Sequence, residues 1–238
     1  MIVNAGGQEL FRVWDNDNTV YGPVGLSTLI QWIHEDRLLP GTFIQTETGH
    51  QWYRAANFEP LQKHLASKEI AGPGPARLDR AVAIESEALR QFEVFSGLTD
   101  DALAQFAALG DGIVATPGQL IVKQGDPCDA VYFVLSGTLR VQLLIGIEKY
   151  EEVLCRISAG EFFGEVGMFL QTTRTADVLA ETDARLLRMT VNAFQLLIKE
   201  TPALAAPLLY ALAGTMARRM AEDNQRLARE ITSEFLWR

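Results

Sequence analysis

The chain has 238 residues, 48% of them hydrophobic, and a formal net charge of −9. The length allows one large domain or two modest ones, and the hydrophobic fraction is normal for a chain that folds around a core. Proteins that bind nucleic acids usually carry a basic face, so this acidic balance predicts no DNA or RNA partner. It leaves room for a local basic pocket that binds one small anion.

Membrane spans and disulfides are also excluded. No apolar run approaches the roughly 20 residues that a helix needs to cross a bilayer. Residues 1–10 lack the basic and apolar stretches of a signal peptide. Cys128 and Cys155, the only cysteines, are too few for a disulfide framework and wrongly spaced for zinc. We therefore expect a cytoplasmic protein without membrane contact.

The first segment, residues 10–65, is short and rich in aromatic side chains. Residues 11–14 alternate like a strand. Ser27 is placed to cap a helix whose apolar residues recur at helical spacing, and Pro40 ends that helix. The pattern predicts a small α+β domain, which we place at residues 1–66.

Residues 67–86 are expected to form a linker. The run Ala71-Gly72-Pro73-Gly74-Pro75 suits neither a helix nor a central strand, because proline lacks a donor and glycine lacks stiffness. Further along, Thr99 is placed to cap a helix. Asp100 and Asp101 follow it, where the positive end of that helix favours acidic side chains.

Residues 112–189 predict an all-β region. Short runs with alternating apolar residues are separated by turns that contain Gly118, Gly125, Gly137 and Gly160. Several short strands with turns of this kind are typical of a β-roll or jelly roll. After Thr190 the pattern becomes helical. With its flanking helices, this second domain is placed at residues 87–202.

Residues 163–170 interrupt the β pattern with one short helical turn. Backbone N–H groups at a helix start can bind an anion, and Gly164 and Gly167 let a ligand approach closely. Arg174 offers a planar cation for phosphate oxygens. Glu165 offers a carboxylate that can accept a hydrogen bond from a ribose hydroxyl.

This segment resembles the cyclic-nucleotide-binding domain family, which includes catabolite-activator-type regulators and the regulatory subunits of cyclic-nucleotide-dependent kinases. The resemblance covers about residues 95–227. The family's phosphate-binding motif reads Phe-Gly-Glu, a small and apolar segment, then Arg-x-Ala, and the chain matches it at Phe163, Gly164, Glu165, Arg174 and Ala176. Residues 124–126 and 132–137 also match the family's earlier strand-and-turn signature.

The resemblance implies a cyclic nucleotide, cAMP or cGMP, bound by Phe163, Gly164, Glu165, Val166, Gly167, Arg174, Thr175 and Ala176. Arg174 would pair with the cyclic phosphate, helped by backbone amides near Val166, Gly167 and Ala176. Glu165 and the Gly164 backbone would hold the ribose 2′-hydroxyl. Thr175 is compatible with cAMP and cGMP, and a cyclic dinucleotide is not excluded.

The chain departs from the family pattern on either side of the arginine. Thr173 replaces a frequent proline, and Asp177 adds an acidic group that would weaken anion binding if it pointed inward.

Residues 203–238 predict a capping or dimerisation helix at the C-terminal end. Spacings of four and three alternate along a coiled-coil stripe of Ala206, Tyr210, Ala213, Ala217, Met220, Asn224, Leu227 and Ile231. In the resembling family this helix often dimerises or caps the base, so we expect a homodimer; the alternative is a helix packed only on its own β-roll. Residues 233–238 are too short for a helix-turn-helix reader, so we expect no DNA-binding output.

The N-terminal segment resembles the bacterial GYF-like domain family over roughly residues 10–61. The resemblance rests on Trp14, the turn at residues 21–24, the helix at residues 26–39, and Gly49 with Trp52. Related GYF domains bind proline-rich peptides on aromatic clusters, because extended proline segments lose little entropy on docking. The candidate partner-binding residues are Trp14, Tyr21, Trp32 and Trp52, although several of them must also build the core.

Neither a metal site nor a catalytic group is predicted. Residues 15–18 begin like a calcium loop, but Val20 and Leu26 occupy the places that need glycine and a carboxylate. The three histidines lie apart, and none pairs with a serine or cysteine at a catalytic spacing: His34, His50 and His64. We expect no enzymatic activity, no metal and no cofactor.

Together these features predict a non-enzymatic bacterial cyclic-nucleotide sensor, with cAMP as the first candidate ligand. It would couple ligand binding to a protein–protein interaction through its N-terminal domain. A proline-rich segment is one class of partner that this domain could bind. The alternative is a constitutive dimeric scaffold whose nucleotide pocket is vestigial.

Overall fold

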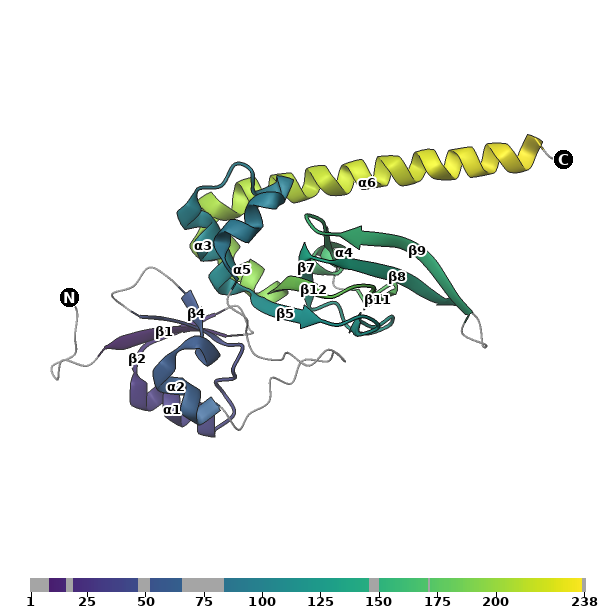
Figure 1. The fold of residues 1–238 in the computed structure, drawn as a ribbon. Coiled ribbons are helices and arrows are strands. Elements are labelled where there is room, and N and C mark those ends of the chain that lie inside the picture. The colour runs from purple at the N-terminus through teal and green to yellow at the C-terminus, as the bar shows by residue number, and fades with distance from the viewer. Residues whose placement is uncertain are drawn as a thin grey trace.

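The structure is a computed structural model that describes residues 9–15, 19–46, 52–65, 84–145, 150–170 and 172–236. It contains an N-terminal α+β region, a β-roll and a long C-terminal helix, which confirms the predicted α+β class (Figure 1). The proline-rich run at residues 71–75 lies outside the described residues, as do residues 16–18, Gly49 and His50.

The N-terminal region is a four-stranded antiparallel sheet with helices on one face (Figure 1). Its strands follow the order β2-β1-β3-β4 and comprise β1 (Leu10–Trp14), β2 (Val20–Gly25), β3 (Phe43–Thr46) and β4 (Trp52–Arg54). Its helices are α1 (Leu26–His34), α2 (Glu59–Leu65) and the short 3-10 helix Ala55–Asn57. The predicted cap at Ser27 is wrong: α1 already begins at Leu26, and no side chain caps it.

Both faces of this sheet are covered, because strand side chains alternate between them. Phe11, Val13 and Ile44 point to α1 and α2 and form a core with them. The neighbouring Trp14 and Phe43, which pair across β1 and β3, belong instead to the core of the following domain. The aromatic residues of this small region therefore divide between two hydrophobic cores.

The β-roll consists of two four-stranded antiparallel sheets. One has the order β10-β7-β12-β5 and the other the order β6-β11-β8-β9. The strands are β5 (Asp111–Ala115), β6 (Leu120–Val122), β7 (Ala130–Ser136), β8 (Thr138–Ile145), β9 (Tyr150–Ser158), β10 (Phe162–Phe163), β11 (Asp177–Ala180) and β12 (Ala184–Thr190). Residues from both sheets, such as Val134 and Val178, share one core.

Gly137 shows why this roll needs glycine in its turns. It joins β7 to β8 with a φ of +88°, a conformation that side chains disfavour. A Cβ at this position would lie 2.3 Å from the carbonyl oxygen of Asp183. The glycine therefore permits both the turn and the close approach of the loop that contains Asp183, between β11 and β12.

Helices connect the roll to the rest of the chain. They are the 3-10 segments η2 (Ser86–Gln91) and η3 (Glu93–Phe95), and α3 (Asp100–Leu109), α4 (Glu165–Leu170), α5 (Val191–Glu200) and α6 (Pro202–Leu236). The Thr99 cap is confirmed, since its hydroxyl accepts a hydrogen bond from the Ala102 amide at 3.3 Å. In Figure 1, α3 and α5 lie next to the N-terminal sheet and the first turns of α6, and their residues share one core with Trp14 and Phe43.

The helix α6 is only partly packed. Leu204, Leu208 and Leu212 in its first turns are buried. Its C-terminal part extends past the body of the protein (Figure 1), and Met220 and Leu227 are 67% and 54% exposed. The side chain of Ile231, the last residue of the predicted stripe, lies outside the described residues.

Candidate functional site

Arg174 lies immediately before β11 and is held there by its own backbone. Its N–H donates to the carbonyl of Asp126 at 2.7 Å, and its carbonyl accepts from the amide of Gly125 at 2.9 Å. The side chain is only 6% exposed. Nη2 donates to Asp129 Oδ1 at 3.0 Å and to the carbonyl of Ala130 at 2.9 Å. The guanidinium is therefore buried in the roll and turned away from bulk solvent.

One donor of this buried guanidinium is unused. Nη1 of Arg174 has no hydrogen-bond partner among the described residues. A buried cationic N–H without an acceptor is costly, and it favours an anion that can supply one. Nη1 faces Gly164, where a Cβ would lie only 2.6 Å from it. The φ of Gly164 is +85°, so glycine serves here both for conformation and for close approach.

Glu165 begins α4 next to Gly164 and is 7% exposed. Its Oε1 accepts a hydrogen bond at 3.1 Å from Nη1 of Arg219, which belongs to α6. Arg219 also donates from Nη2 to the Phe162 carbonyl at 2.8 Å and lies 4.7 Å from the centre of the Phe162 ring. A carboxylate has several acceptor sites, so this contact leaves capacity for a further donor.

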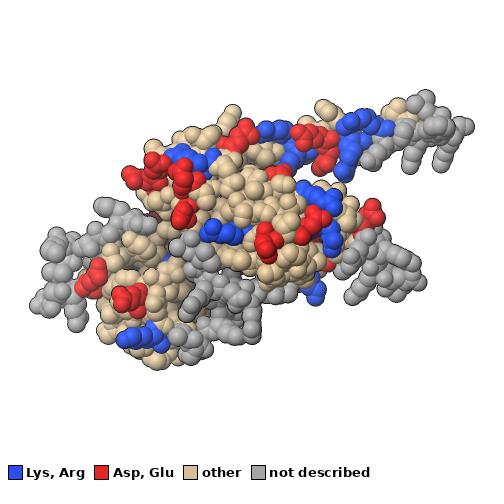
Figure 2. Space-filling model, in the orientation of Figure 1, with Lys and Arg blue, Asp and Glu red and all other residues tan. Residues whose placement is uncertain are grey.

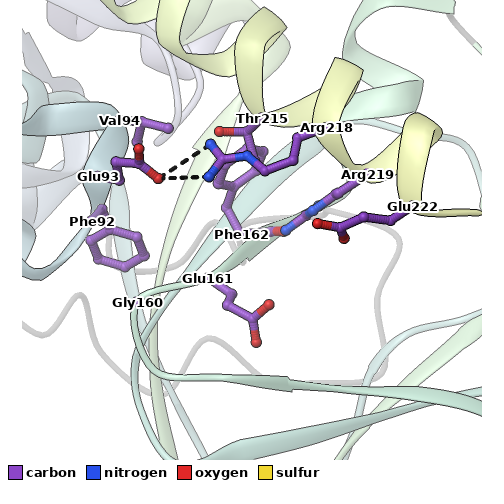
Figure 3. A pocket seen from close by; sticks show the side chains of 10 residues that line it. All are labelled: Phe92, Glu93, Val94, Gly160, Glu161, Phe162, Thr215, Arg218, Arg219 and Glu222. Atoms are coloured by element: carbon purple, nitrogen blue, oxygen red, sulfur yellow. Dashed lines mark hydrogen bonds and ion pairs between the residues drawn. The ribbon is translucent and has the colours of Figure 1, made fainter.

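A cavity of about 210 Å³ lies between α6 and the turn before β10 (Figure 3). Arg218 and Arg219 both line it but point differently: Arg218 pairs with Glu93, and Arg219 reaches toward Phe162 (Figure 3). Because Arg219 also binds Glu165, one side chain belongs both to the cavity wall and to the contact with the cassette.

The other predicted ligand-binding residues have different environments. Phe163 is buried and stacks on Tyr132, with ring centres 5.0 Å apart and planes 8° apart. A Cβ on Gly167 would lie 1.9 Å from the Cβ of Cys128, so this glycine lets α4 pack closely on the loop before β7. Ala176 is buried, whereas Thr175 and Val166 have exposed side chains. The structure thus brings Gly164, Glu165 and Arg174 together.

Asp177 is buried beside the arginine, on the first residue of β11. Its Oδ1 accepts a hydrogen bond from the backbone amide of Gln124 at 2.6 Å. This carboxylate is therefore engaged in fixing the preceding turn.

Three contact residues of the site were not identified from the sequence: Asp129, Tyr132 and Arg219. Asp129 binds Nη2 of Arg174, and the Arg174 guanidinium lies 5.4 Å from the centre of the Tyr132 ring. Arg219 is 54 positions from Glu165 in the chain, a separation at which no local pattern indicates contact. The sequence signal available is an arginine pair, Arg218-Arg219, in a helix otherwise rich in small residues.

The candidate partner-binding aromatics do not form one surface. Trp14 and Trp52 are 1% and 5% exposed and lie in the core shared with α3 and α5. In this arrangement both rings contact the chain's own second domain and neither is open to a partner. Tyr21 is 37% exposed, and Trp32 is partly buried with Arg37 4.9 Å from its ring centre.

The comparison with known families agrees with this geometry. Residues 113–201 match the model of the cyclic nucleotide-binding domain. This segment is similar to the cyclic nucleotide-binding domain family. The match does not extend to residues 10–61, where the GYF-like resemblance stays a prediction.

Two curated relatives cover similar parts of the chain. The cAMP-dependent protein kinase regulatory subunit of Colletotrichum orbiculare is 31% identical over 110 residues, which are 46% of this chain and 27% of that protein. Glutaminase 1 of Bradyrhizobium diazoefficiens is 29% identical over 143 residues, which are 60% of this chain and 22% of that protein. The matched part of the chain thus spans only about a quarter of either relative.

Solved structures share the fold of the cyclic nucleotide-binding domain. The catabolite activator protein of Thermus thermophilus has a TM-score of 0.50 at 28% identity, over 56% of this chain and 61% of its own. A cyclic nucleotide-binding domain from Methylobacillus flagellatus has a TM-score of 0.55 at 19% identity, over 61% of this chain and 82% of its own.

Within the part of the chain that the structure describes, no helix is both long and apolar enough to cross a membrane. The same residues contain no group of three or more His, Cys, Asp and Glu side chains that could hold a metal ion.

Proposed function

We propose that this protein is a cyclic-nucleotide sensor that binds its ligand at residues 163–176, with cAMP as the first candidate and cGMP as the second. The observation that carries this proposal is the buried Arg174 guanidinium, whose Nη1 faces Gly164 and has no acceptor in the part of the chain that the structure describes. It lies in a segment that matches the cyclic nucleotide-binding domain.

Each polar group of the cassette has a separate role in this proposal. Nη1 of Arg174 donates to an oxygen of the cyclic phosphate, while Nη2 stays on Asp129 and Ala130. The Glu165 carboxylate accepts from the ribose 2′-hydroxyl in addition to Arg219. Because Arg219 belongs to α6, a ligand that binds Glu165 acts on the position of that helix. The ligand biases α6 only as far as it prefers one of its arrangements.

We propose further that α6 pairs with α6 of a second copy. The stripe predicted from the sequence is exposed along the described part of the helix, with Tyr210 85% exposed. Acidic and basic side chains alternate along α6 in Figure 2, as they do beside the seam of a coiled coil. A second copy would bury apolar groups that a single chain leaves in water.

We assign the protein no catalytic step, so its output passes through a protein partner of the N-terminal region. Among the aromatic residues predicted to bind that partner, Tyr21 is the most exposed, at 37%. The GYF-like resemblance supports a proline-rich segment as the class of partner.

Calorimetry with cAMP, cGMP and a cyclic dinucleotide tests the ligand assignment. Removal of a buried phosphate partner costs about 2–5 kcal/mol, so Arg174→Ala should weaken binding by more than about tenfold. Arg156→Ala is the matched control, because Arg156 is exposed in the same domain and pairs with Glu181. If no cyclic nucleotide binds the parent protein, a constitutive scaffold with a vestigial pocket replaces the sensor. If Arg174→Ala binds like the parent, the site is wrongly placed.

A further inference from the structure

A chain of ion pairs runs from Arg174 through the roll. Asp129 accepts from Nη2 of Arg174 at 3.0 Å through Oδ1, and its Oδ2 is paired with Nη2 of Arg188. Nη1 of Arg188 lies 3.2 Å from Oδ2 of Asp111. Each carboxylate in this chain is thus shared between two guanidinium groups.

The last ion pair of this series joins the β-roll to the N-terminal region. Asp111 Oδ1 lies 2.9 Å from Nε of Arg54, the last residue of β4, as an ion pair whose N–H direction gives no hydrogen bond. Nη2 of Arg54 also donates to the carbonyl of Leu109, the last residue of α3, at 3.2 Å. The contact of Arg54 with Asp111 and Leu109 therefore joins the two domains, and it is the last contact in the series of ion pairs that begins at Arg174.

Strand register produces this alignment. In the sheet β10-β7-β12-β5, Arg188 of β12 lies opposite Tyr132 on one side and opposite Asp111 on the other. Asp129 directly precedes β7, and its carbonyl accepts from the amide of Val191 at 2.9 Å. Arg188 is thus fixed between the two carboxylates by backbone pairing.

Most groups of this ion-pair network are shielded from water, although the Asp129 side chain is 32% exposed. Arg54, Asp111 and Arg174 are 5%, 7% and 6% exposed. Burial lowers the pKa of Arg54, while the attraction of Asp111 opposes that change. For Arg188, burial also disfavours the charge, but Tyr132, Asp129 and Asp111 outweigh it and raise the pKa above its ordinary value. Charges between buried groups are screened weakly by solvent. A change in the charge at Arg174 therefore alters the strength of the other ion pairs in the series.

The series of ion pairs also carries an excess of one positive charge. Arg54, Arg174 and Arg188 carry three positive charges against two negative charges on Asp111 and Asp129. A cyclic phosphodiester carries one negative charge, which would balance the network at Nη1 of Arg174, a donor that no described residue accepts from.

Resting on the proposed function, we infer that Asp129, Arg188, Asp111 and Arg54 couple ligand binding at Arg174 to the docking of the N-terminal region. A ligand phosphate neutralises Arg174 and weakens its hold on Asp129, which then interacts more fully with Arg188. The ion pair between Arg188 and Asp111 then weakens, so Asp111 interacts more strongly with Arg54. Ligand binding thus strengthens the contact between the domains.

Thermodynamic linkage makes this effect reciprocal: docking must strengthen ligand binding by the same factor by which ligand strengthens docking, so weakening the Arg54 contact should also weaken ligand binding. We expect Arg54→Gln to raise the Kd for cAMP or cGMP by about fivefold or more, and Arg54→Lys to recover part of the loss. Arg12→Gln is the matched control. Arg12 pairs with Glu200 at 3.6 Å across the same domain boundary, but it is not one of the residues in the series of ion pairs that begins at Arg174. It should bind ligand like the parent.

Amide hydrogen exchange on the parent protein tests the coupling without any substitution. Ligand should slow exchange in β4 and α3, the elements joined by Arg54. A parent that binds no cyclic nucleotide overturns both the sensor and the coupling. If the parent binds but Arg54→Gln has an unchanged Kd, or β4 and α3 exchange at unchanged rates, the coupling alone is wrong. Equal losses in Arg54→Gln and Arg12→Gln would also overturn it, since docking as a whole and not the ion-pair chain would then be responsible.

Discussion

Glu165 and Arg219 are 54 positions apart in the chain, yet a hydrogen bond of 3.1 Å joins their side chains. Glu165 belongs to α4, in the segment that matches the cyclic nucleotide-binding domain, and Arg219 belongs to α6, the helix that follows that segment. The contact is partly buried, with the Glu165 side chain 9% exposed and the Arg219 side chain 35% exposed. It gives α6 a direct connection to the carboxylate that we assign to the ribose.

Substitution of Arg219 should therefore change ribose recognition. Arg219→Met removes the charge that orients Glu165, and we expect a loss of about 1 kcal/mol, or roughly fivefold in Kd. The discrimination between cAMP and its 2′-deoxy analogue should shrink with it, as calorimetry with both ligands would show. Arg218→Met is the control, since Arg218 pairs with the exposed Glu93 and should leave both affinities as they are. If Arg219→Met discriminates between cAMP and its 2′-deoxy analogue as well as the parent does, Arg219 has no role in ribose binding.

Alanine at Gly164 should abolish ligand binding. The positive φ alone costs about 1–2 kcal/mol of stability for a residue with a Cβ. That Cβ would also lie 2.6 Å from Nη1 of Arg174 and displace the guanidinium. Gly118→Ala makes the matched comparison, because Gly118 has a φ of +81° with nothing within 4 Å of the added atom. Both variants should lose stability in urea, but Gly118→Ala should bind the nucleotide normally; equal binding by the two would argue against the close approach at Arg174.

The exposed stripe of α6 should control the oligomeric state. A lysine at Leu227 would place a charge in the proposed seam, so Leu227→Lys should shift the mass measured by light scattering toward the single-chain value of 26.3 kDa. Gln225→Lys makes the same change of charge beside the stripe and should keep the dimer. A parent protein that is already monomeric at micromolar concentration would refute pairing through α6.

Removal of the Trp14 ring should destabilise the contact between the domains. Trp14 is 1% exposed, its Nε1 donates to Asn192, and Lys199 lies 4.9 Å from its ring centre. Trp14→Ala leaves a cavity in this shared core, so we expect a loss of about 3–5 kcal/mol in the free energy of unfolding. Gln62→Ala, at an exposed position of α2 in the same region, should change it by less than about 0.5 kcal/mol. Urea denaturation of both variants gives the comparison, and a small effect at Trp14 would mean that the two domains unfold independently of this contact.

The sequence by itself determined the features that depend on neighbouring residues. Glycine turns with alternating apolar residues indicated the β-roll, and the spacing of Phe163, Gly164, Glu165 and Arg174 indicated the cassette, which lies within the segment that matches the family. These patterns are visible because turn conformation, strand alternation and a short phosphate-binding segment each extend over only a few residues.

Only the tertiary structure decided what lies opposite each of these residues. Trp14 and Asn192 are separated by 178 positions and Asp111 and Arg188 by 77, so no local pattern pairs them. Two of the four aromatic residues that we predicted for a partner, Trp14 and Trp52, pack against the chain's own second domain for the same reason: apolar composition shows that a side chain must be buried, but not against what. The partner of each buried charge depends on strand register and domain docking, which are set by the packing of the whole chain.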